Sequence, residues 1–162
     1  MSLNLFKELG YTHCGYLQRL SENKGSIGKE LWYEFVISDI KLSTNPGPLV
    51  YLWFYKDEII YVGETSKSVK ERIINGHFGG FRGGSNSGVE KQKQLLHLDE
   101  DRIDIFIAFQ PFFLKYLHEK VKSVDGNNFS KMFYPIHNDM MLAKYLEEKS
   151  IISMFNPKLN IK

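Results

Sequence analysis

Two short apolar runs on either side of a polar break constrain this chain more than any other feature. Residues 49–55 read LVYLWFY, residues 59–63 read IIYVG, and residues 56–58 (KDE) separate them. Short runs of aromatic and β-branched residues around a polar turn are typical of a β-hairpin. The preceding residues 44–48 (TNPGP) exclude regular structure, because proline lacks an amide donor and restricts the residue before it. We therefore expect the hairpin to begin a structural unit near residue 46.

The register of this hairpin decides whether two tyrosines share one face of the sheet. If Tyr55 lies opposite Ile59 across a three-residue loop, Tyr51 faces Gly63 and Tyr61 lies on the same side. Both tyrosines would then lie beside a bare glycine that a phosphate could approach. A two-residue loop without a bulge would instead place them on opposite faces.

Helices are expected after the hairpin and near the C-terminus. Ser68 and Glu71 form a capping-box pattern that opens a short helix towards Gly76. Apolar positions between 141 and 155 recur at helical spacing after Asn138, a suitable N-cap. In the stretch between the two helices, Ile103, Ile105 and Ile107 alternate with their neighbours, which predicts a strand.

The first 45 residues also carry helical spacing, in the two apolar sets Leu3, Phe6, Leu9 and Tyr16, Leu17, Leu20. Residues 31–40 fit a helix or a strand equally well. We therefore expect residues 1–45 to form a helical extension packed on a core of residues 46–162, with an insertion at about 79–137. The fold class is α+β, with a small antiparallel or mixed sheet flanked by helices.

The composition fits one globular domain. The chain has 162 residues, of which 43% are apolar, enough to exclude a disordered chain. No apolar run approaches the roughly 18 to 20 residues that span a bilayer. The first residues (MSLNLFKE) lack a secretory signal, and the single cysteine, Cys14, cannot close an internal disulfide. We therefore expect a cytoplasmic protein without a membrane partner.

The charge is mild in total but uneven along the chain. The formal net charge is +2, which by itself does not indicate a nucleic-acid partner. The basic residues between positions 63 and 98 are Lys67, Lys70, Arg72, Arg82, Lys91 and Lys93. An acidic cluster follows at 99–104. Such a segregated run forms either a nucleic-acid-binding face or a plain solvated face.

The order of short motifs resembles the GIY-YIG nuclease family over much of the chain. Five elements occur in that family's order: residues 49–51, residues 61–63, Arg72, His77, and Glu148 with the following Pro157 and Asn160. The resemblance implies a metal-dependent endonuclease that hydrolyses phosphodiester bonds in DNA. The absence of a recognisable added DNA-binding module is similar to the restriction-enzyme branch, whose members often act as dimers on palindromic sites.

The family's chemistry gives each motif residue an expected role. Tyr51 would activate a water as general base, with Tyr61 as its partner or as the alternative base. Arg72 would stabilise the charge that develops on the phosphoryl group, and His77 would hydrogen-bond the phosphate or relay a proton. Glu148 would bind one divalent cation, Mg²⁺ or Mn²⁺. Zinc is not expected, because the cysteine and the histidines form no ligand-spaced pair.

These residues also have plain structural explanations. The two tyrosines could simply pack a sheet. Arg72 could pair with Glu71 or Asp57 on a helix surface, and His77 could cap the end of that helix. Glu148 could be a solvated glutamate paired with Lys144 four residues earlier.

The substrate expected from the resemblance is double-stranded DNA, and a homodimer is one arrangement in which it would be bound. The residues expected to contact it are Gly63, Lys67, Lys70, Arg82, Lys91, Lys93 and Asn160. Two other readings remain open: a repair, recombination or mobile-element nuclease of relaxed or structure-based specificity, and a DNA-binding module that has lost the reaction. Leu49, which stands where the first motif usually has glycine, favours the second of these.

Overall fold

The computed structural model describes residues 2–79, 86–98, 101–125 and 139–160. In this part of the chain, five strands form one sheet in the order β2-β1-β5-β3-β4, and every neighbouring pair is antiparallel. The strands are β1 (Thr12–Arg19), β2 (Tyr33–Ile37), β3 (Leu49–Tyr55), β4 (Glu58–Thr65) and β5 (Arg102–Ala108). The expected α+β class, with an antiparallel sheet flanked by helices, is confirmed.

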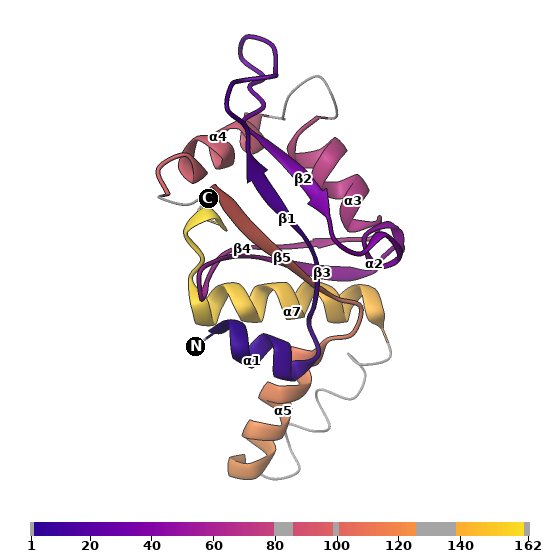
Figure 1. Cartoon of the computed structure of the whole chain (residues 1–162). Helices are drawn as coiled ribbons and strands as arrows, with labels where there is room; N and C mark the ends of the chain where they lie inside the picture. The colour runs from indigo at the N-terminus through magenta and orange to yellow at the C-terminus, as the bar shows by residue number, and fades with distance from the viewer. Residues whose placement is uncertain (1, 80–85, 99–100, 126–138, 161–162) are drawn as a thin grey trace.

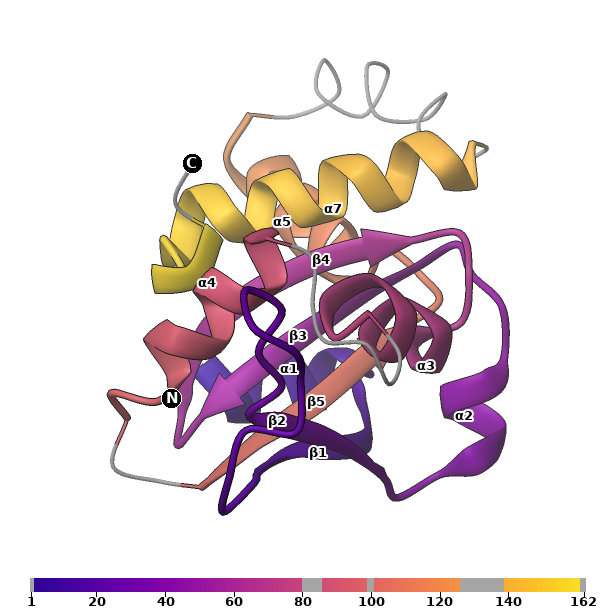
Figure 2. The ribbon, with the colours of Figure 1, turned by 90° about the horizontal axis from the view of Figure 1, so that it is seen from above.

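Helices cover both faces of the sheet (Figures 1 and 2). One face carries α1 (Ser2–Leu9), α5 (Phe112–Asp125) and α7 (Met140–Phe155). The other face carries α3 (Val69–Glu71), the π-helix Arg72–His77 that continues it, and α4 (Asn86–Leu95). A short α2 (Ile40–Thr44) precedes β3, and a 3₁₀ turn, Lys158–Asn160, follows α7.

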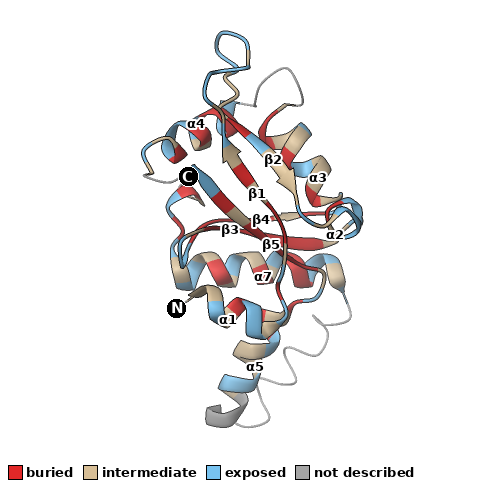
Figure 3. Ribbon diagram, in the orientation of Figure 1, coloured by how far each residue is buried: buried red, intermediate tan, exposed pale blue. Residues whose placement is uncertain are grey.

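Strand β3 is buried on both faces, which explains its unbroken apolar sequence. Tyr51 and Trp53 belong to the core under α3 and α4, whereas Val50, Leu52 and Phe54 belong to the core under α1, α5 and α7. Successive side chains of a strand point to opposite faces, so a strand between two helical layers needs apolar residues at every position. Figure 3 shows the buried residues concentrated in this central region.

The expectation of a helical extension at residues 1–45 is wrong between α1 and α2. Residues 12–19 and 33–37 form β1 and β2, so this segment supplies two strands of the central sheet. The pairing of β1 with β5 shifts between His13 and Gly15, which leaves Cys14 as the extra residue of a β-bulge. The bulge interrupts the alternation, so Cys14 and Leu17 are both fully buried in the same core at a three-residue spacing. The helical spacing of Tyr16, Leu17 and Leu20 has another origin, because Leu20 lies beyond the end of β1.

The hairpin prediction is right about the tyrosine positions and wrong about the loop. Tyr51 pairs with Gly63 and Trp53 pairs with Tyr61, as expected. However, Tyr55 pairs with Glu58 rather than with Ile59, across the two-residue turn 56–57. A bulge beside Trp53 then shifts the register by one residue. The bulge restores the shared face that a two-residue loop alone would have abolished.

The later elements follow the sequence with one omission. The predicted strand is β5, which lies at the centre of the sheet between β1 and β3. The predicted C-terminal helix is α7, and its N-cap is Asp139, whose carboxylate accepts from the amides of Met141 and Leu142 at 3.0 and 3.1 Å. Helix α5 was not predicted. In the described ranges, no helix is both long and apolar enough to span a bilayer.

Candidate active site

The hydroxyl of Tyr51, on β3, meets two side chains of the π-helix. It lies 2.8 Å from Nε2 of His77 and 3.4 Å from Nε of Arg72, which donates to it. Arg72 and His77 are the first and last residues of the π-helix, whose i to i+5 hydrogen bonding is seen in the 3.0 Å bond from the Phe78 amide to the Ile73 carbonyl. Short π segments are rare and often mark functional sites. The wide turn lets both side chains reach one hydroxyl.

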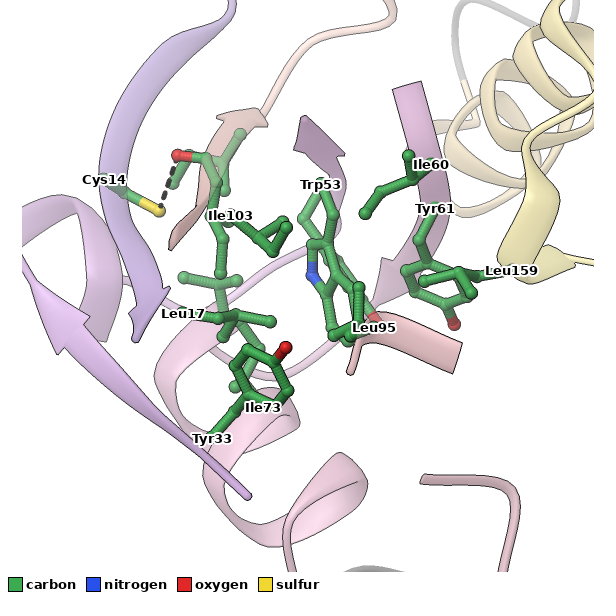
Figure 4. Packing of buried hydrophobic residues seen from close by; sticks show 14 of the residues in the cluster. Cys14, Leu17, Tyr33, Trp53, Ile60, Tyr61, Ile73, Leu95, Ile103 and Leu159 are labelled. Atoms are coloured by element: carbon green, nitrogen blue, oxygen red, sulfur yellow. Dashed lines mark hydrogen bonds between the residues drawn. The ribbon is translucent and has the colours of Figure 1, made fainter. Parts of the chain in front are cut away.

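An aromatic cluster encloses His77. The His77 ring centroid lies 5.1 Å from that of Trp53, 5.4 Å from that of Tyr61 and 6.0 Å from that of Tyr51. Figure 4 shows Trp53 and Tyr61, from neighbouring strands, in the same buried cluster as Leu95. The predicted sharing of one sheet face by Tyr51 and Tyr61 is therefore confirmed.

Helix α4 brings a second cation to this cluster. The ammonium of Lys91 lies 4.9 Å from the centre of the Tyr61 ring, within the range of a cation–π contact. The helix can lie close to the end of the π-helix because Gly88 has no Cβ. A Cβ at this position would lie 2.0 Å from the carbonyl oxygen of His77. Gln92, one turn further on, accepts a 2.8 Å hydrogen bond from the amide of Trp32. Lys91 is thus positioned by contacts on both sides of it.

Burial governs the ionisation of the cluster. Burial, and then the charges of Lys91 and Arg72, lower the pKa of His77 to about 3, so its imidazole is neutral near pH 7. Burial likewise raises the pKa of Tyr51 well above its usual value and raises that of Tyr61. Both tyrosines are therefore protonated in the free protein, and a neutral His77 can accept the Tyr51 proton.

Gly63 does not offer the open approach that we expected. A Cβ at this position would lie 2.4 Å from both Cζ and the hydroxyl oxygen of Tyr51, so the tyrosine ring fills the space above the glycine. Gly63 itself is buried. Its physical role is to admit the Tyr51 ring, and the prediction that it contacts substrate directly is not supported by this geometry.

The two adjacent glutamates of α7 point to different sites. Glu147 is fully buried and accepts hydrogen bonds from the Tyr11 hydroxyl at 2.5 Å and from the amides of Phe113 and Leu114 at 2.8 and 2.7 Å. It therefore satisfies the first amides of α5. Glu148 lies on the side of Tyr61, whose pKa its charge helps to raise. The structural role of Glu147 leaves Glu148 as the candidate of the two, although Glu148 is not among the residues that line the cleft described below.

Glu148 is not paired with Lys144, the structural alternative considered for it. Its carboxylate lies 3.2 Å from the ammonium of Lys149, and its side chain is 14% exposed. Burial raises the pKa of Glu148, and the nearby charge of Glu64 raises it further. Lys144 instead forms an ion pair with Glu64 and donates to the Ser66 hydroxyl at 3.0 Å.

A cleft of about 470 Å³ opens beside these residues. The end of β4, the π-helix and α7 line it with Glu64, Thr65, Ser66, Lys67, Glu71, Arg72, Asn75, Gly76 and Lys144. Lys67 is the one predicted substrate-binding lysine in this lining, and its ammonium lies 2.7 Å from the Glu71 carboxylate. Glu71 therefore pairs with Lys67. A pair between Glu71 and Arg72 was the structural alternative considered for Arg72.

The remaining predicted DNA contacts have varied positions. The side-chain amide of Asn160 accepts a hydrogen bond from the Val62 amide and donates one to the Val62 carbonyl, at 2.7 Å each. This residue therefore fastens the C-terminal turn to β4. Lys93 pairs with Glu90 at 3.0 Å on the exposed side of α4. Lys70 is partly exposed and does not line the cleft, and Arg82 lies outside the described residues.

Sequence analysis missed several residues that shape the site. Trp53, Glu64, Gly88 and Gln92 were not singled out, and Lys144 was considered only as a partner of Glu148. One signal was available: Lys144 and Glu148 are four residues apart and so lie on one side of a helix. The contacts of Gly88 and Gln92 leave no local signal, because their partners are distant in sequence.

Glu148 and Glu64 are the two carboxylates near the site that could supply oxygen ligands to a hard divalent cation. In the described part of the chain, no group of three or more histidine, cysteine, aspartate or glutamate side chains could hold a metal ion. Glu148 has a second carboxylate, Glu64, close enough to raise its pKa. Mg²⁺ commonly takes one or two carboxylates and completes its shell with water and phosphate oxygens. Such a cation would also relieve the repulsion between the two carboxylates.

Comparison of the chain with protein-family models, with curated proteins and with solved structures finds no match. The functional argument therefore depends on the residues and their geometry.

Proposed function

We propose that this chain is a metal-dependent endonuclease that hydrolyses phosphodiester bonds in double-stranded DNA. The observation that carries the proposal is the Tyr51 hydroxyl, held 2.8 Å from a neutral His77 and 3.4 Å from Arg72. All three residues stand at positions where the sequence resembles the GIY-YIG family. A tyrosine with its own proton acceptor and a neighbouring guanidinium suits the activation of a water beside a phosphate.

The Tyr51 hydroxyl would act as the base through a two-proton transfer. The proton of the attacking water passes to the Tyr51 oxygen while the Tyr51 proton passes to Nε2 of His77. The hydroxide forms the new bond to phosphorus as the bond from phosphorus to the leaving oxygen breaks. The His77 imidazolium is a strong acid because its pKa is lowered, so it gives its proton to the leaving oxygen by way of solvent and becomes neutral again. Tyr61, whose ring centroid lies 5.9 Å from that of Tyr51, holds the base in place.

Charge on the phosphoryl group would be stabilised from two sides. The Arg72 side chain is exposed towards the cleft and can bridge two phosphate oxygens. Glu148, with Glu64 beside it, would hold the divalent cation. When bound, the cation supplies Lewis-acid stabilisation of the phosphoryl and leaving oxygens. We further propose that cleavage is sequence-specific, as in the restriction-enzyme branch that the motifs resemble.

The experiment is cleavage of mixed plasmid and phage DNA by the purified protein with Mg²⁺, with Mn²⁺ or with EDTA. The variants are Arg72→Ala, Arg72→Lys and Glu148→Gln. Matched controls are Arg19→Ala, which removes another partly exposed arginine, and Glu90→Gln, which removes an exposed helix glutamate. We expect discrete fragments that need metal, and rates reduced roughly 100-fold or more in the site variants but not in the controls.

Each other outcome has a definite meaning. Fragments without preferred ends would contradict sequence specificity and favour a nuclease of relaxed specificity. DNA that is retarded on a gel at low salt yet stays intact with both metals would contradict the reaction and favour a binding module. DNA that is neither bound nor cut would refute the whole proposal.

A further inference from the structure

Lys144 is a buried cation inside the cleft. Its side chain is only 8% exposed, and its ammonium contacts the Glu64 carboxylate and lies 3.0 Å from the Ser66 hydroxyl. An ammonium has three N–H donors, and these two partners account for two of them. In the described part of the chain, no acceptor is hydrogen-bonded to the third N–H of the Lys144 ammonium. Lys144 can therefore take one more acceptor without losing either contact.

The position of Lys144 relates it to the proposed chemistry. Lys144 and Glu148 lie one turn apart on α7, a rise of about 6 Å along the helix axis. Arg72 lines the same cleft from the π-helix. The two cations thus approach the same cleft from different elements.

Glu64 restrains this lysine. The remaining cleft lysine, Lys67, is an exposed residue paired with Glu71 four residues later, an arrangement with little energetic consequence. The pair of Lys144 with Glu64 is different because Lys144 is buried, so its ammonium is held at the cleft wall rather than in solvent. A carboxylate at this place also competes with any phosphate for the same ammonium.

We infer that Lys144 binds a backbone phosphate of the DNA in this cleft, and that Glu64 holds its ammonium in place and weakens that contact. The inference rests on the proposed function and adds a substrate-binding residue to it. It also gives a function to a lysine that is buried in the wall of the cleft.

The test is binding of a fluorescent DNA duplex in EDTA, measured by anisotropy over a series of salt concentrations. The variants are Lys144→Met and Glu64→Gln. The matched controls are Lys158→Met and Glu58→Gln, because this pair also joins β4 to the C-terminal region, with its charged atoms 3.7 Å apart and both side chains exposed. Glu58 and Glu64 are six residues apart on β4, a separation of roughly 20 Å along the strand.

We expect Lys144→Met to weaken binding to all sequences alike and to lower the slope of log K against log [salt] by about 0.9, the loss of one phosphate contact. Glu64→Gln should bind the duplex more tightly than the wild type. Neither control should change affinity or slope. If Lys144→Met does not fold, Glu64→Gln still decides the question, since it retains the lysine.

Two results would overturn the inference, and they differ in what they say of the proposed function. If the wild type binds the duplex but the Lys144 and Glu64 variants behave like their controls, the ion pair is structural and the nuclease proposal stands. If the wild type does not bind the duplex, the proposed function fails and the inference fails with it.

Discussion

Nε2 of His77 lies 2.8 Å from the hydroxyl oxygen of Tyr51, although the two residues are 26 positions apart. The contact depends on two local irregularities. A bulge in the hairpin keeps Tyr51 and Tyr61 on one face, and the π-helix turns both Arg72 and His77 towards that face. Both residues are buried, so the contact is part of the core.

His77 makes stability depend on pH. Its folded pKa, about 3, lies below the ordinary value of 6.5, so the unfolded chain binds the proton more readily. The contribution to folding is therefore complete above pH 6.5 and is lost as pH falls towards 3. Relative to His77→Gln, the wild type should gain about 1.4 kcal/mol of unfolding free energy per pH unit in this window. Urea unfolding between pH 5 and 7 would measure it, and parallel curves for the two proteins would contradict the lowered pKa.

Gly63→Ala should destabilise the fold. The new Cβ would lie 2.4 Å from two atoms of Tyr51, a ring that is fully buried and cannot move away freely. Overpacking of this kind typically costs about 1 to 3 kcal/mol. Denaturant unfolding would measure the loss, and the same substitution in a Tyr51→Ala background should cost less. Equal costs in both backgrounds would show that the tyrosine ring is not what the glycine accommodates.

Gly76→Ala should affect activity rather than folding. Its Cβ would lie 3.3 Å from Cδ and Nη1 of Arg72, a flexible side chain that can shift. Alanine is favoured over glycine by about 1 kcal/mol inside a helix, so the unfolding free energy should hold or rise. The displaced guanidinium should slow metal-dependent cleavage. Unfolding and cleavage assays on one preparation check both halves, and full activity would mean that Arg72 need not occupy this position.

Substitutions of the two neighbouring glutamates of α7 should affect stability and catalysis separately. Glu147→Gln puts an amide donor where the carboxylate accepts from Phe113 and Leu114, so we expect a loss of about 1 to 3 kcal/mol with cleavage retained in the folded fraction. Glu148→Gln should abolish metal-dependent cleavage with little loss of stability. Calorimetric titration with Mn²⁺ supplies a readout independent of cleavage, with weaker binding expected only for Glu148→Gln. The reverse pattern would exchange their roles.

Much of the core could be predicted from the sequence because its signals are local. The hairpin, the strand at 103–107 and helix α7 each carry their own periodicity within one short window. The candidate site residues were likewise found by their order along the chain. Three of them, Tyr51, Arg72 and His77, are brought together as that order suggested.

The tertiary structure alone decided what depends on bulges and on distant partners. The bulge at Cys14 places this residue in the same core as Leu17, and no pattern in the sequence of residues 12–19 indicates it. The bulge beside Trp53 places Tyr51 and Tyr61 on one face of the hairpin, and the turn residues 56–57 do not indicate this bulge.

Contacts with residues distant in the sequence also give different roles to side chains that are alike in type and position along the chain. Glu147 and Glu148 are identical residues side by side, yet one caps α5 and the other faces Tyr61. Lys144 was expected beside Glu148 and pairs with Glu64 on another element. The sequence determined which residues have the chemistry that the proposed nuclease reaction requires. Only the packing of α4 and α7 on the sheet determined which of them can reach it, because hydrogen bonds and ion pairs depend on distances in space and not on spacing along the chain.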